Sequence, residues 1–135
     1  MVLDTLVYTI SFLMIPINIA AMRAKYILMN IGIIVMATSW ATHSIWHVKD
    51  KPCTTIYCSL DEVVCILSVA TLTMYSFLYS RFIYFFIPLF SGIYSFYKLR
   101  GNKNYHKRGL SNWRYHKYHI LMHASGIVCL TIVSI

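Results

Sequence analysis

The chain has 135 residues, of which 59% are hydrophobic and 12% are charged, and its formal net charge is +8. A soluble domain of this length could not bury so much apolar surface, so the composition predicts an all-α integral membrane protein. Seven of the twelve basic residues lie between Lys98 and Lys117, beside predicted spans, which favours contact with membrane lipid and argues against nucleic acid as a partner.

Five apolar runs predict membrane-spanning helices in a compact bundle, because each is near the ~20 residues that a helix needs to cross a bilayer. In chain order they cover residues 6–22, 26–46, 60–79, 82–97 and 119–135. The first run has no basic segment before it and ends at Arg23 and Lys25, so we interpret it as a retained span. No soluble domain fits between the runs, and residues 1–135 are predicted to form one polytopic membrane domain.

The third and fourth runs are separated only by Ser80 and Arg81, which indicates either a tight helical hairpin or one long bent helix. The fourth run is the shortest and contains Pro88, so it is predicted to be kinked or to cross the membrane incompletely. A basic loop, residues 98–118, follows it.

The basic residues predict the sidedness of the chain. With five spans, Lys49 and Lys51 share a side with the basic loop, and the opposite side has only three basic residues. The positive-inside rule therefore places the basic loop and the N-terminus in the cytosol.

Polar residues that are unusual in spans occur at three span ends. Ser39, His43 and His47 follow one another at four-residue intervals, so they share one helical face. "SLDEVV" opens the third span with Asp61 and Glu62, and "HILMH" opens the fifth with two histidines one turn apart. These three span ends lie on one side of the predicted bundle, so we expect their polar side chains to converge.

Histidines one turn apart are suited to metal binding, and three neutral imidazoles with a water form an open zinc site. Zinc makes that water acidic, while a nearby carboxylate can take up its proton and a serine hydroxyl can donate a hydrogen bond. Taken singly, the same residues are also explained as interfacial histidines, as acids in the first turn of a helix, and as a small polar residue at a helix contact.

The stretches "SWATH", "LDE" and "HILMHASG" together resemble the three-part signature of the CREST superfamily of membrane proteins. This group includes alkaline ceramidases, adiponectin-receptor-like proteins, the Per1 family and the myomaker branch. The resemblance implies zinc bound by His43, His119 and His123, with Asp61 and Ser39 beside the metal-bound water. His47 lies one turn beyond His43 and is the alternative ligand.

The front half, with "FLMIPINIAAMRAKY", is most similar to the myomaker branch. Members of the superfamily usually have seven core helices, so the resemblance implies a reduced version with five. Losing two helices preserves the direction in which the last span enters the membrane.

Three functions follow as hypotheses. The first is a zinc-dependent intramembrane hydrolase of a lipid amide or ester, such as ceramide. The second is a non-enzymatic, myomaker-like protein of membrane remodelling, fusion or complex assembly, in which the metal is structural. The third is a b-type haem protein, with His43 or His47 facing His119 or His123 as axial ligands. The sequence indicates no protein partner.

Overall fold

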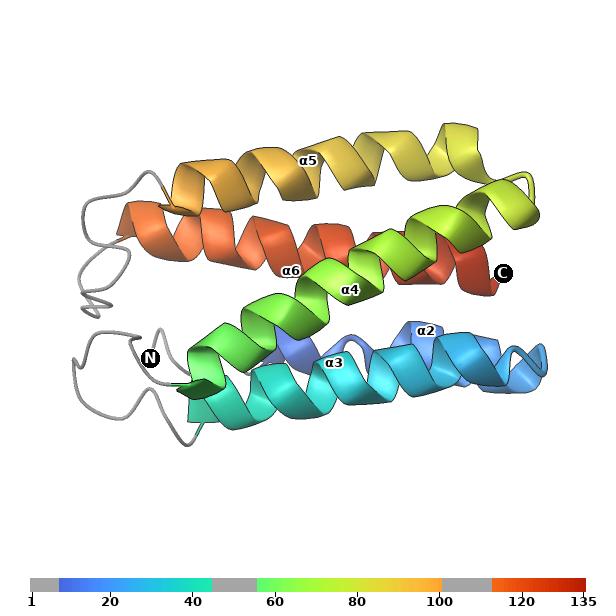
Figure 1. The fold of residues 1–135 in the computed structure, drawn as a ribbon, viewed down its shortest axis with the longest axis horizontal. Helices are drawn as coiled ribbons and strands as arrows, with labels where there is room; N and C mark the ends of the chain where they lie inside the picture. The colour runs from blue at the N-terminus through green and yellow to red at the C-terminus, as the bar shows by residue number, and fades with distance from the viewer. Residues whose placement is uncertain (1–7, 45–55, 101–112) are drawn as a thin grey trace.

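The computed structural model describes residues 8–44, 56–100 and 113–135, and these residues form an all-helical bundle (Figure 1). Its helices are α2 (Met14–Met22), α3 (Tyr26–Ser44), α4 (Ile56–Leu78), α5 (Phe82–Arg100) and α6 (Trp113–Ser134). Residues 8–11 are also helical and lead through a turn at residues 12–13 into α2. The described part of the chain contains no strand, which confirms the predicted all-α class.

The helices differ from the predicted spans mainly at the basic loop. α5 continues to Arg100 and α6 begins at Trp113, so both ends of the predicted loop 98–118 are helical. Pro88 lies inside α5, and the helix continues through it. The centre of the loop, and residues 45 and 46 of the second predicted span, lie outside the described residues.

Two short turns join the helices in pairs, α2 with α3 and α4 with α5. Each turn contains one residue in the left-handed region, Ala24 with φ 55° and Ser80 with φ 54°. In each turn the next amide donates back across the helix end, as Arg81 N does to Ser76 O at 2.8 Å. This bond satisfies a carbonyl that the last helical turn would otherwise leave unpaired. Of the two arrangements predicted at Ser80 and Arg81, the tight hairpin is therefore the one observed.

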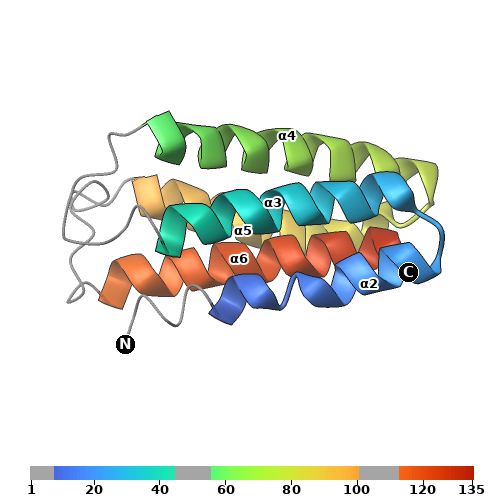
Figure 2. The same cartoon turned by 90° about the horizontal axis from the view of Figure 1, so that it is seen from below.

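The arrangement of the helices gives the bundle two distinct ends. The end of α3 and the beginnings of α4 and α6 lie together, and we call this the site end (Figures 1 and 2). Both hairpin turns and the end of α6 lie at the opposite end, which we call the turn end (Figure 1). The three span ends expected to share one side are thus at one end of the bundle.

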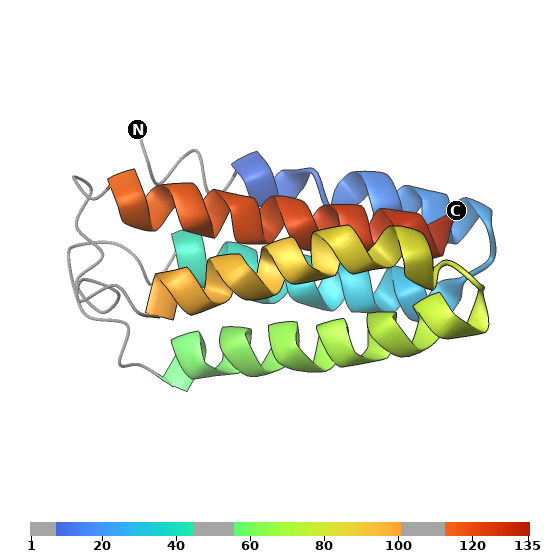
Figure 3. The same cartoon turned by 90° about the horizontal axis from the view of Figure 1, so that it is seen from above.

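α6 is the central helix, because it packs against each of the other four. α4 crosses the bundle obliquely and lies beside α3 at the site end and beside α5 at the turn end (Figures 1 and 3). All five helices contribute to the apolar core, which includes Ile17, Leu28, Leu72, Phe85 and Leu130.

Gly32 allows α3 to approach α2 and α6 closely within this core. A Cβ atom at Gly32 would lie 2.6 Å from Ile17 Cγ1 and 3.0 Å from Leu130 Cδ2. Both distances are shorter than ordinary van der Waals contact, so any side chain here would push the helices apart.

Two described helices are long and apolar enough to cross a membrane, Ser59–Leu78 and Phe82–Leu99. Only 11% of the first and 17% of the second is buried inside the bundle. Tyr8–Met22 and Tyr26–Thr42 are shorter apolar helices. The outer surface of α4 and α5 is therefore strongly apolar, with exposed side chains such as Leu67 and Ile87.

Many serine and threonine hydroxyls donate to a carbonyl one turn earlier in their own helix. Examples are Thr71 to Leu67 O at 2.9 Å, and Thr131 to Ile127 O at 2.7 Å. These hydroxyls are satisfied locally and need no partner from another helix.

Candidate polar site at one end of the bundle

A hydrogen bond joins α3 to α4 at the site end. Ser39 Oγ donates to Asp61 Oδ1 at 2.8 Å. Ser39 lies on the inner face of α3 and is only 2% exposed, whereas Asp61 is half-buried in the second turn of α4. The carboxylate is therefore held by a buried hydroxyl from the neighbouring helix, which fixes its position.

Two histidines lie near this pair on the first half of α6. His119 and His123 are one turn apart, their ring centroids are 4.6 Å apart, and the ring planes cross at 69°. The side chain of His119 is only 4% exposed, so it lies inside the bundle.

Thr9 adds a contact that the sequence analysis did not identify. Its Oγ1 lies 3.1 Å from His123 Nδ1, although the two residues are 114 positions apart in the chain. A hydrogen bond at one ring nitrogen restricts the orientation of the imidazole, as the outer partners of metal-binding histidines do. The only sequence signal is a hydroxyl residue in an apolar run, which is too common to single out Thr9.

Ser39, Asp61 and the two histidines line one cavity of about 370 Å³. The cavity lies between α3, α4, α5 and α6, where α4 leans away from α5. Its ionisable lining residues are Asp61, Glu62, Cys65, His119, His123 and Cys129, and all of them except Cys129 belong to the site-end half of their helices. The rest of the lining is mostly apolar and reaches Leu72 and Phe85. The cavity is thus polar at one end and apolar along the rest of its length, and its volume is that of a small ligand pocket.

Four of the residues predicted for the site are therefore brought together. The remaining two are not described: His47 lies outside the described residues, and so does the side chain of His43, although its backbone belongs to the last turn of α3. Among the described side chains, no group of three or more His, Cys, Asp or Glu is arranged to hold a metal ion.

The donor set around the cavity fits zinc as far as it is described. Imidazole is a ligand type that zinc accepts, and a catalytic zinc site takes three protein ligands, of which His119 and His123 would supply two. His43 would supply the third, because it follows Ser39 by one helical turn.

Comparison of the chain with family models, with curated proteins and with solved structures found no match. The resemblance to the CREST superfamily therefore depends on the three short motifs alone.

Proposed function

We propose that the protein is an integral membrane protein whose five helices all cross the bilayer. The strongest support is the low burial of its two longest apolar helices, because equally apolar helices of a soluble protein would form its core. Extraction of membranes with alkaline carbonate tests this proposal. The protein should remain in the pellet, and release into the supernatant would contradict it.

We further propose that the protein is a CREST-like, zinc-dependent hydrolase that cleaves an amide or ester bond of a membrane lipid. The observation that carries this proposal is the single cavity shared by Ser39, Asp61, His119 and His123, because its polar end continues into an apolar space. A lipid could lie with its acyl chain between α4 and α5 and its polar bond beside these residues.

Each residue has a definite part in the proposed chemistry. His119 and His123 would hold zinc together with His43, and bound zinc supplies a Lewis acid that activates water for hydrolysis. Asp61, positioned by the Ser39 hydroxyl, would take up a proton from the attacking water and return it to the leaving group. The apolar lining would exclude bulk water and orient the acyl chain.

Elemental analysis of the protein purified in detergent tests the metal. The wild type should contain about one zinc per chain, since one open site is proposed. His119→Ala and His123→Ala should lose it, whereas His116→Ala, a histidine of α6 outside the proposed set, should retain it. A well-folded wild-type protein without zinc after purification in the presence of the metal would contradict the proposal.

Hydrolysis of labelled lipid amides and esters in mixed micelles tests the reaction. Asp61→Asn should keep zinc and lose turnover, since the substitution removes the base and preserves the shape of the side chain. A protein that binds zinc but gives no turnover with either lipid class would favour the non-enzymatic membrane-remodelling function instead. An intense Soret band of the purified protein would favour haem.

A further inference from the structure

The turn end carries positive charge without neutralising acids. Arg23 and Lys25 lie at the α2–α3 turn and Arg81 at the α4–α5 turn. The only acidic side chains in the described part of the chain are those of Asp61 and Glu62, and both belong to the site end. No described aspartate or glutamate therefore lies beside these three cations.

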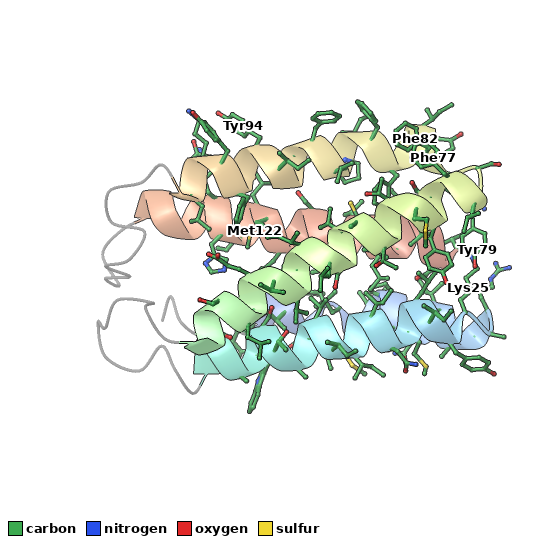
Figure 4. All side chains as sticks on the ribbon, in the orientation of Figure 1. Lys25, Phe77, Tyr79, Phe82, Tyr94 and Met122 are labelled. Carbon is green, nitrogen blue, oxygen red and sulfur yellow. The ribbon has the colours of Figure 1, made fainter. Side chains whose placement is uncertain are left out.

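Lys25 is fixed in place by contacts with α6 and with the α4–α5 turn. Its Nζ donates to Val133 O of α6 at 2.9 Å and lies 4.2 Å from the centroid of the ring of Tyr79, which directly follows α4. Figure 4 shows Lys25 and Tyr79 side by side at the turn end. The hydrogen bond to Val133 occupies one of the three N–H donors of the ammonium group.

The charges of Arg23 and Arg81 act on Lys25. Partial burial lowers the pKa of Lys25, and the nearby charges of Arg81 and Arg23 lower it further. An anion bound here would relieve this repulsion, and such clusters of basic groups attract phosphates.

A small pocket accompanies the charges. It has a volume of about 280 Å³ and is lined by residues of the α2–α3 turn and the end of α4, including Lys25, Tyr26, Tyr75 and Tyr79. Lys25 and three phenolic side chains thus border one space, and Arg23 and Arg81 belong to the same two turns as Lys25 and Tyr79. Arginine is suited to phosphate because its planar guanidinium presents paired N–H donors.

We propose that the turn end binds one phosphate group, as found in the headgroup of an anionic phospholipid, between Arg23, Lys25 and Arg81. Aromatic and basic side chains at a helix end are well placed to contact headgroups, while the apolar outer faces of α4 and α5 would contact the acyl chains. This site lies at the opposite end of the bundle from the proposed zinc site and does not depend on it.

Binding of a fluorescent phosphatidylglycerol to the protein in neutral detergent micelles tests the proposal. Arg23→Gln and Arg81→Gln should each weaken binding about fivefold, and the double variant about 25-fold, because each basic residue contributes a similar electrostatic attraction near a headgroup. Lys98→Gln, which removes a charge from the site-end half of α5, is the matched control and should change binding less than twofold. Both arginines are exposed, so these variants should fold normally.

Competitors then distinguish the source of the phosphate. Displacement by millimolar inorganic phosphate would identify a site for free phosphate, and displacement only by unlabelled phosphatidylglycerol would identify a lipid headgroup site; both outcomes support the proposal. Equal losses in the arginine variants and in Lys98→Gln would show only an effect of net charge and would overturn it. No loss in the double variant, or equal binding of phosphatidylcholine, would also overturn it.

Discussion

Polar side chains make different kinds of contact at the two ends of the bundle. At the site end, hydroxyls and ionisable groups contact one another, as Ser39 contacts Asp61 and Thr9 contacts His123. At the turn end, Lys25 contacts a backbone carbonyl and an aromatic ring, and no described aspartate or glutamate lies there. The difference shows that one small bundle can gather ionisable side chains around an internal cavity at one end and place basic side chains without described acidic neighbours at the other.

The largest effect is expected from Asp61→Ala at the site end. Loss of the proposed general base should lower the rate of lipid hydrolysis at least ~100-fold, because positioned acids and bases contribute about that much. Glu62→Ala removes the same charge from the same cavity and is the control, with a change of less than about fivefold expected. Equal losses in both variants would show that the site requires negative charge only and not the Ser39-bound carboxylate.

The core that connects the two ends should be the next most sensitive region. Gly32→Ala should lower the free energy of unfolding by about 1–2 kcal/mol, since overpacking outweighs the better helix propensity of alanine. Gly126→Ala is the matched control, because a Cβ there meets no atom within 4 Å, and it should leave stability unchanged or raise it by up to ~1 kcal/mol. Both values can be measured by denaturant unfolding in detergent; equal stabilities would contradict close packing at Gly32.

Thr9 tests whether the contact with His123 supports the metal. Thr9→Val should weaken zinc binding about tenfold, the lower range for loss of an outer hydrogen bond to a metal-binding histidine. Thr9→Ser retains the hydroxyl and should restore the affinity, which separates the hydrogen bond from packing. Competition with a zinc chelator measures this effect, and identical affinities of the valine and serine variants would exclude a positioning role.

The smallest effect is expected at the turn end. Lys25→Met removes the donor to Val133 O and should lower the free energy of unfolding by about 1 kcal/mol, as for other cations at the end of a helix. Lys98→Met, on the exposed surface of α5, should change it by less than ~0.5 kcal/mol. Thermal unfolding of the two variants, compared at one pH, checks the difference; equal losses would contradict the capping role of Lys25.

The sequence predicted the helices and their alternating directions along the bundle. Apolar runs and charged interruptions marked all the described helices, and the alternation of spans brought Ser39, Asp61 and His119 to one end. It left the turn at Ser80 undecided, because a serine in the left-handed region has no distinctive sequence signal.

The contacts between helices were less predictable. Helices that are apolar on most faces do not indicate which face meets which neighbour, so neither Thr9 beside His123 nor Lys25 beside Val133 could be inferred. Both pairs are more than 100 positions apart in the chain. The sequence also did not predict that both ends of the basic loop 98–118 are helical. Charged residues that follow an apolar run were assigned to a loop, although a helix can continue beyond its apolar residues.

The hydroxyls that form hydrogen bonds within their own helix lower the free-energy cost of placing α6 in the hydrocarbon of a membrane. α6 is not among the two helices that satisfy the length and hydropathy criteria for a span. Yet Ser125 and Thr131 already donate hydrogen bonds to Leu121 O and Ile127 O. Transfer of α6 into hydrocarbon would therefore leave neither hydroxyl without a hydrogen bond. A residue-by-residue hydropathy sum therefore overstates the cost of inserting this helix, and α6 is better suited to the bilayer interior than its composition alone indicates.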